Sequence, residues 1–390
     1  MRDVVITEAV RTPIGRRGGG LSTMHAAELL AVAQRAVVEH SGIDPAEVEQ
    51  IVGGCISQVG MQAYNVTRTA WLVSGFPVET AATTVDSQCG SSQQATSLAA
   101  SLVASGVVDV AMACGVEVMS QVPIGASLAP GLGKAIPKSY FERYEYTTQF
   151  QAAELIAEKW GISREELDAF GLESQQRAQR AWGEGRFDGQ VVPVDAPDVG
   201  EDGKPTGTTH RVARDEGLRE TSMEALAGLK PVVGPDGYHT AGTSSQISDG
   251  AAAVLMMTPE KAAALGMRPR ARIVDSCLVG SDPTLMLTGP IGATHRLLER
   301  TGLAIGDVHL TEINEAFASV VLAWERELQP DHATVNPNGG AIALGHPLGS
   351  TGAVLITKAV HELERADLET ALVTMCCGGG LGTGTILQRV

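Results

Sequence analysis

Cysteine, histidine and asparagine side chains stand in four short clusters whose other residues are mostly small. The clusters are 88–92 (QCGSS), 314–318 (NEAFA), 345–349 (GHPLG) and 376–380 (CCGGG). They supply thiols at two places, one imidazole and one carboxamide, which are functional groups that enzymes use for catalysis by a thiolate nucleophile. A single cysteine with a distant histidine would be a weak signal, but four such clusters in one chain are a strong one.

Cys89 is the candidate nucleophile. It precedes a predicted helix that begins near Gly90, so its sulfur is expected near free backbone N–H groups and the positive end of the helix dipole. Such a position can lower the pKa of a thiol to about 3.5–7.5. The alternative is an inert buried cysteine, the commonest fate of a free one, and the other three clusters weigh against it.

Composition excludes several classes of protein. Asp and Glu outnumber Lys and Arg by 45 to 29, giving a formal net charge of -16, whereas nucleic-acid binding needs a basic surface. No run approaches the roughly 18 apolar residues of a membrane span, and the first residues show no signal-peptide pattern. Six cysteines in 390 residues do not form a disulfide scaffold, so we expect free thiols and a cytoplasmic location.

Apolar runs alternate with Ala-rich helical stretches, which predicts parallel sheets with helices on both faces. The expected strands are 3–9, 48–55, 108–115, 270–281, 308–313 and 370–376, and the expected helices are 26–41, 91–105, 291–302, 319–327 and 349–364. The stretches 89–115 and 346–378 share an order: a polar loop, a helix with a Ser/Gly-rich start, an acidic turn and a buried strand. This order predicts two similar α/β halves produced by internal duplication.

Residues 119–248 differ from both halves. They hold an apolar, Gly- and Pro-containing stretch at 122–136, one or two helices within 150–186, and a loop-like region at 191–214. A long insertion of this kind usually covers or shapes a site. The alternative is a variable surface segment that has no role in the site. The stretch 122–136 suits the wall of an acyl pocket. The tyrosines and phenylalanine of 140–146 would narrow that pocket, or anchor the insertion or an oligomer contact.

These motifs resemble those of the thiolases, which form and cleave 3-ketoacyl-coenzyme A. The matching segments are 8–15 (EAVRTPIG), 53–55 (GGC), 314–317 (NEAF), 345–349 (GHPLG) and Cys376-x-Gly378-Gly379-Gly380. The resemblance covers essentially the whole chain and implies an α/β thiolase fold, with two duplicated halves layered αβαβα and an inserted loop domain. The implied domains are 1–118, completed by about 249–268; the loop domain 119–248; and 269–390.

The resemblance also implies a role for each cluster. His346, held in a Gly-His-Pro turn, would take the proton of Cys89 and help to polarise the acyl thioester oxygen. Asn314 would hold a water that forms an oxyanion hole together with the histidine, and Glu315 would orient its neighbours. An N-cap of the following helix is the other role open to Asn314, and both could hold at once.

Cys376 matches the second cysteine of the family. It would deprotonate C2 of acetyl-CoA in synthesis, or protonate the departing carbanion in cleavage. Cys377 occupies an unrestricted position, and this adjacent pair departs from the commoner single cysteine. The backbone N–H groups of Cys89 and Gly378 would form a second oxyanion hole.

Coenzyme A is expected as a co-substrate, with no permanently bound cofactor. Arg219 matches a position that contacts its nucleotide end in relatives, Ser245 matches one near the pantetheine, and Phe317 is expected along the same tunnel. Some thiolases carry a pantetheine-contacting histidine where this chain has Thr148. No metal site is expected, because the cysteines lack paired CxxC spacing.

The implied activity is CoA-dependent thiolytic cleavage of 3-ketoacyl-CoA to acetyl-CoA and a shortened acyl-CoA through an acyl-Cys89 intermediate. Segments 170–188 and 240–253 look most like actinobacterial thiolases of fatty-acid and steroid side-chain breakdown. The alternatives are a biosynthetic acetoacetyl-CoA thiolase, a ketosynthase-like condensing enzyme and a non-enzymatic lipid carrier. A homodimer or homotetramer is usual for the family, and the sequence leaves the acyl group open.

Overall fold

The computed structural model describes residues 2–129, 131, 133–200 and 203–390. Its first half is built from β1 (Val5–Arg11), α1 (Ala26–Ser41), β3 (Gln50–Gly54), α2 (Val66–Val73), β4 (Ala81–Val85), α3 (Ser91–Ser105), β5 (Val110–Val118) and β8 (Ser248–Met257). Its second half is built from β9 (Ala271–Gly280), α8 (Gly289–Thr301), β10 (Leu310–Ile313), α9 (Ala318–Leu328), α11 (Thr351–Arg365), β11 (Thr370–Cys377) and β12 (Leu381–Arg389).

Helices α1 and α3 have the bounds that the sequence predicted. Each ends at a glycine in the left-handed conformation, Gly42 with φ 69° and Gly106 with φ 81°, where a residue without Cβ is favoured. Helix α3 is rich in Ala and Ser, and much of it is buried. Small side chains allow this helix to lie in the middle of the molecule with neighbours on several sides.

The strands form one ten-stranded mixed sheet in the order β10-β11-β12-β9-β1-β8-β5-β3-β4, with the short β2 (Gly15–Arg16) on β8. β3 runs parallel to β4 and β5, and β10 runs parallel to β11. The other six neighbouring pairs among the described strands of this sheet are antiparallel, so the expectation of parallel sheets is wrong for most of the strand pairs. β12 illustrates the reason, because three glycines join it to β11 and so short a turn connects only antiparallel neighbours.

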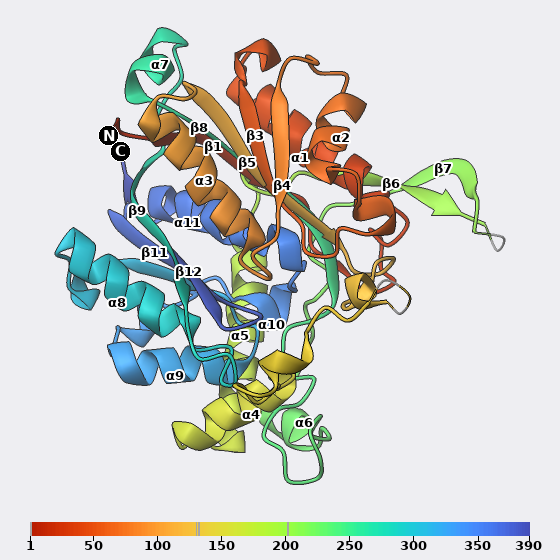
Figure 1. Ribbon diagram of the computed structural model, residues 1–390, viewed down its shortest axis with the longest axis vertical. Coiled ribbons are helices and arrows are strands. Elements are labelled where there is room, and N and C mark those ends of the chain that lie inside the picture. Colours follow the sequence, from red (N-terminus) through yellow and green to blue (C-terminus); the bar gives the residue numbers. More distant parts are fainter. Residues whose placement is uncertain (1, 130, 132, 201–202) are drawn as a thin grey trace.

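The two halves repeat one pattern. The order β3-β5-β8-β1 has the same sequence of parallel, antiparallel and antiparallel contacts as β10-β11-β12-β9. Helices α3 and α11 pack against each other and against strands of both halves, while α1 covers the first set of strands and α8 the second (Figure 1). This gives the layered α/β architecture that the resemblance implied, in which the halves join where β1 pairs with β9 at Val5↔Arg272 and Ile6↔Ala271.

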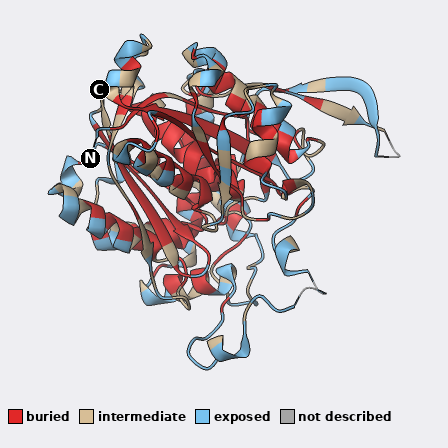
Figure 2. Ribbon diagram, turned by 45° about the horizontal axis from the view of Figure 1, so that its top comes forward, coloured by how far each residue is buried: buried red, intermediate tan, exposed pale blue. Residues whose placement is uncertain are grey.

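The insertion contributes α4 (Gln149–Lys159), α5 (Arg164–Gly183), the hairpin of β6 (Val194–Val199) and β7 (Pro205–Val212), and the short α6 (Met223–Ala227). The hairpin extends away from the body (Figure 1) and is largely exposed (Figure 2). Two further short helices, α7 (Pro259–Ala264) and α10 (Ala341–Leu344), follow later in the chain. Since β8 pairs with β1 and β5, we propose the domain limits 1–118 with 249–268, 119–248 and 269–390.

Burial is concentrated in the sheet and in the two central helices (Figure 2). Strands β5, β8 and β11 are buried along their whole length, as expected for strands covered on both faces. Within the described part of the chain, we find no helix with the length and apolar character needed to traverse a bilayer.

Candidate active site

Two parallel strands place the clusters 314–318 and 376–380 at one edge of the sheet. β10 ends at Ile313, directly before Asn314, and its neighbour β11 ends at Cys377. The backbone N–H of Asn314 donates to the carbonyl of Thr374 at 3.0 Å, so the asparagine continues the ladder. Because the carboxyl ends of parallel neighbours meet at the same edge, Asn314 and the cysteine pair lie close together.

Cys89 is brought to the glycine-rich turn after β11. The backbone N–H of Gly378 hydrogen-bonds the Cys89 sulfur, and Gly378 itself lies so close to Gln88 that an added Cβ would be 3.0 Å from its Oε1. Of the six cysteines, Cys89 alone is half-buried, whereas the other five are buried. The structure therefore gives Cys89 an N–H donor for its sulfur and makes it the most exposed of the six cysteine residues.

The pKa of Cys89 is raised to about 11, so the expectation of a lowered pKa is wrong. Burial of the sulfur is the largest cause. The hydrogen bonds from the backbone N–H groups of Gly378 and of Cys89 itself act in the opposite direction but are smaller, and the carboxylates of Glu117 and Asp86 raise the pKa further. At neutral pH the nucleophile is thus a thiol that needs a base to remove its proton.

His346 is buried in a turn that fixes its ring. Its backbone N–H donates to Ser248 Oγ at 3.0 Å, its Nδ1 lies 2.6 Å from Thr351 Oγ1, and its Nε2 lies 3.3 Å from Asn314 Nδ2. Gly345 has φ 113°, and a Cβ there would overlap the Ser248 side chain. Burial lowers the pKa of His346 to about 3, so the imidazole is neutral and able to accept a proton.

Asn314 is not a helix cap. α9 begins at Ala318 with Phe317 as its N-cap, so the N-cap alternative is wrong because three further residues of irregular chain follow Asn314 before the helix. Its Nδ2 faces His346, and its Oδ1 is buried without a hydrogen-bond partner among the described residues. A buried polar atom of this kind usually meets a water or a ligand.

Glu315 ties the end of β10 to the insertion. Its carboxylate accepts from Ser174 Oγ of α5 at 2.6 Å, from Asn336 Nδ2 at 2.9 Å and from the backbone N–H of Ile342 at 3.2 Å. Its side chain therefore holds the loop before α10 in place, and its orienting role stays a prediction.

The adjacent cysteines face opposite sides of β11, as alternation along a strand requires. Cys376 belongs to the core cluster that contains Ala316 and Phe317, whereas Cys377 belongs to the cluster around α3. A Cβ on Gly90 would come within 2.6 Å of the Cys377 sulfur. Burial raises the pKa of both thiols, and the charge of a Cys89 thiolate raises it further, so both lie near the candidate nucleophile.

Glu117 and Thr351 were missed by sequence reasoning. Buried Glu117 accepts from the backbone N–H groups of Ile56 at 3.0 Å, Ser57 at 3.1 Å and Gly349 at 2.9 Å, so it fastens the His346 turn to the end of β5. A glutamate inside an otherwise apolar strand was the available signal, since such a residue is seldom buried without partners. Thr351 carries no comparable signal in the sequence.

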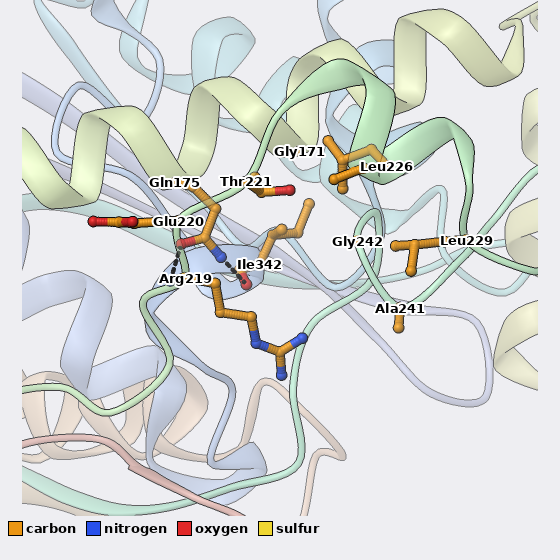
Figure 3. A pocket seen from close by; sticks show the side chains of 11 residues that line it. Gly171, Gln175, Arg219, Glu220, Thr221, Leu226, Leu229, Ala241, Gly242 and Ile342 are labelled. Carbon is orange, nitrogen blue, oxygen red and sulfur yellow. Dashed lines mark hydrogen bonds between the residues drawn. The ribbon is translucent and has the colours of Figure 1, made fainter.

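The predicted coenzyme A contacts fall in two neighbouring places. Arg219 lines a cavity of about 170 Å³ whose other lining residues are Gly171, Gln175, Glu220, Thr221, Ala225, Leu226, Leu229, Ala241, Gly242 and Ile342 (Figure 3). Gln175 fixes this wall by accepting from the Arg219 N–H at 2.9 Å and donating to the Ile342 carbonyl at 3.4 Å.

Ser245 and Phe317 lie together beside that cavity rather than in its lining. The Ser245 N–H donates to the Ala316 carbonyl at 2.9 Å. The Phe317 ring is buried against Phe150 and His239, with centroid distances of 4.9 and 5.5 Å. Because Ala316 and Phe317 directly follow the Asn314–Glu315 pair, this contact links the cavity wall to the candidate catalytic cluster of Cys89, Asn314, His346 and Cys376.

Two features of the insertion bear on the ligand site. Thr148 is the N-cap of α4, in a capping box with Gln151, so this position serves the helix end. The described residues of the segment 122–136 lie mostly at the surface, with Ile124 55% and Leu128 60% exposed, and residues 130 and 132 lie outside the described part of the chain. Residues 128, 131 and 133–136 line an open hollow of about 520 Å³, and the role of this segment in acyl selection stays a prediction.

No group of three His, Cys, Asp or Glu side chains in the described ranges could hold a metal ion.

Family models match nearly the whole chain. Residues 4–260 match the thiolase N-terminal domain, and residues 267–389 match the thiolase C-terminal domain. The chain belongs to the thiolase family. It is therefore an acyltransferase.

Similar thiolases differ in the substrates that their names state. The chain is 46% identical over 398 residues to the steroid 3-ketoacyl-CoA thiolase FadA6 of Mycobacterium tuberculosis, covering 100% of this chain and 95% of that protein. It is 42% identical over 407 residues to the 3-oxoadipyl-CoA/3-oxo-5,6-dehydrosuberyl-CoA thiolase of Escherichia coli, with both chains fully covered. The crystal structure of the Bacillus anthracis acetyl-CoA acetyltransferase superposes with a TM-score of 0.90 at 37% identity, covering 100% and 99% of the two chains.

Iodoacetamide is expected to modify Cys89 of this thiolase before the other cysteines, because Cys89 is the most accessible thiol. Only the thiolate reacts, and the pKa of Cys89 is raised to about 11. The modification rate should therefore keep rising with pH from about 6 to about 10, roughly tenfold per unit. Mass spectrometry of quenched samples measures this rate, and a plateau already reached near neutral pH would contradict it.

Proposed function

We propose that this thiolase cleaves 3-ketoacyl-CoA with free coenzyme A, giving acetyl-CoA and a shortened acyl-CoA, in the breakdown of lipids or steroid side chains. The observation that carries the proposal is the meeting of Cys89 with the Gly378 N–H, beside the strand ends that hold Asn314 and Cys376. The names of similar proteins support both the reaction and the steroid or fatty-acid setting.

In the first half-reaction, Cys89 attacks the 3-keto carbon while His346 Nε2 takes the thiol proton. The N–H groups of Cys89 and Gly378 stabilise the oxygen that becomes negative, as an oxyanion hole does. The bond between C2 and C3 then breaks, and the acyl group remains on the Cys89 sulfur. Cys376 protonates C2 of the departing enolate, whose oxygen is stabilised by His346 and by a water on Asn314, and acetyl-CoA leaves.

In the second half-reaction, coenzyme A attacks the acyl-Cys89 thioester. Its thiol proton passes to the Cys376 thiolate, its sulfur bonds to the acyl carbon, and the leaving Cys89 sulfur recovers its proton from His346. Both thiols thereby return to their starting state. The raised pKa values of Cys89 and Cys376 suit groups that must hold a proton between turnovers.

Coenzyme A is proposed to bind with its nucleotide end at Arg219 and its pantetheine beside Ser245 and Phe317. This route runs from the cavity of Figure 3 along the contact between Ser245 and Ala316 toward the catalytic cluster. We further propose acyl-CoA and coenzyme A as the ligands, a homodimer or homotetramer as the assembly, and a cytoplasmic location.

The proposal is tested by following loss of 3-ketoacyl-CoA with and without free coenzyme A. Acetoacetyl-CoA, a long-chain 3-ketoacyl-CoA and a steroid side-chain 3-ketoacyl-CoA are compared by kcat/KM. Thiolysis that requires coenzyme A is expected with at least one substrate, and the ratios assign the acyl preference. A condensing enzyme without thiolysis, or binding without turnover, would favour the ketosynthase-like or carrier alternatives.

Cys376→Ala is expected to keep acylation at Cys89 from an acyl-CoA but to lose carbon–carbon cleavage by about 10²–10⁴-fold, the usual contribution of a general acid or base. Cys377→Ala is the matched control, because Cys377 is the neighbouring buried thiol on the opposite face of β11. Intact-mass detection of the acyl-enzyme and a thiolysis assay separate the two steps. Severe loss in Cys377→Ala with an active Cys376→Ala would reverse the assignment.

A further inference from the structure

We propose that Thr351 is a positioning residue that fixes which imidazole nitrogen of His346 carries the hydrogen. The inference rests on the proposed role of His346 as the base that takes the Cys89 proton. A neutral imidazole has one N–H and one lone pair, and only the tautomer with its lone pair on Nε2 can act as that base from this nitrogen.

The Nε2 side of the ring indicates where the lone pair lies. Asn314 presents its Nδ2 amide group to His346 Nε2 at 3.3 Å. An amide nitrogen only donates hydrogen bonds, so Nε2 accepts and carries no hydrogen. The hydrogen of the neutral ring therefore lies on Nδ1.

The Nδ1 side provides the matching acceptor. Thr351 Oγ1 lies 2.6 Å from Nδ1 and 2.9 Å from the Pro347 carbonyl, both inside the protein. A carbonyl only accepts, so the threonine hydroxyl donates its hydrogen to Pro347 and turns a lone pair toward His346 Nδ1. The ring is thus held between a donor at Nε2 and an acceptor at Nδ1, and the opposite tautomer would lose both hydrogen bonds.

A hydroxyl in this place has a different effect from a carboxylate. A carboxylate beside Nδ1 orients the ring and also stabilises the imidazolium that forms. The neutral Thr351 oxygen orients the ring without adding a negative charge, and burial keeps the pKa of His346 at about 3. The proton taken from Cys89 is therefore held weakly and is readily returned when the acyl group leaves.

A threonine hydroxyl bonded to the carbonyl four residues earlier is also a common feature of helices, and α11 contains a second example that serves as a control. Buried Thr357 Oγ1 donates to the Ala353 carbonyl at 2.8 Å, and among the described residues it makes no hydrogen bond to His346. Replacing either threonine by valine removes the same kind of helix hydrogen bond. Only the Thr351 change also removes the acceptor of the imidazole.

The experiment compares Thr351→Val, Thr351→Ser and Thr357→Val in the full-length enzyme. Thr351→Val is expected to lower kcat for thiolysis by about 10- to 100-fold, with KM for substrate and coenzyme A little changed. Thr351→Ser should restore most of the turnover, and Thr357→Val should match Thr351→Val in thermal stability while keeping normal turnover. If either valine variant fails to fold, the pair Thr351→Ala and Thr357→Ala replaces it.

Equal turnover in Thr351→Val and Thr357→Val, with an active wild-type enzyme, would overturn this inference alone. A failure of serine to restore turnover would also overturn it, because serine keeps the hydroxyl. Absence of CoA-dependent thiolysis in the wild-type protein would overturn the proposed function and this inference with it.

Discussion

Replacing Cys89 with alanine is expected to abolish thiolysis, lowering kcat by at least about 10⁴-fold, because loss of a covalent nucleophile removes the intermediate itself. The thiolysis assay with the best substrate measures this loss. Cys277→Ala is the matched control, since burial raises the pKa of Cys277 to about 11 as well and its thiol contacts the Ala293 carbonyl at 3.6 Å, outside the catalytic cluster. Near-normal turnover by Cys89→Ala would require another nucleophile.

Replacing His346 with glutamine is expected to lower kcat by about 10²–10⁴-fold, the range associated with loss of a general base. Because the pKa of Cys89 is about 11, its side chain is a protonated thiol at neutral pH, and it needs a base to remove the proton.

His361→Gln controls for the removal of a buried neutral imidazole. Burial lowers the pKa of His361 to about 4, and its Nε2 lies 3.0 Å from the carbonyl of Ala9 in β1. The His361 variant is expected to keep most of its turnover. If the two variants lost the same activity, His346 would have only a structural role.

Local signals predicted the helices well and the sheet only in part. Gly42 and Gly106 mark the ends of α1 and α3 because a left-handed residue stops each helix. The sequence did not indicate α2 or β4, and the antiparallel direction of β8 depends on a partner strand more than 100 residues away. Strand direction follows from such tertiary pairing, which the hydrophobic pattern does not encode.

The sequence predicted candidate site residues that lie near one another in the structure, but it did not predict the raised pKa of Cys89. Asn314, His346 and the cysteines stood out because polar side chains were embedded in small, turn-forming segments. The pKa of Cys89 could not be predicted, because the dominant effect is burial by distant parts of the chain. Glu117 and Ser248 reach the His346 turn across 232 and 98 residues of sequence, so local patterns could not reveal their role.

The most direct test of the central claim is to find where the acyl group resides during turnover. The wild-type enzyme is mixed with its best 3-ketoacyl-CoA in the absence of free coenzyme A, quenched with acid and digested for peptide mass spectrometry. The account predicts one acyl group, shortened by two carbons, on the peptide that contains Cys89, and its loss when coenzyme A is added. An acyl group on Cys376 or Cys377, or CoA-dependent thiolysis without any acyl-enzyme, would contradict the account.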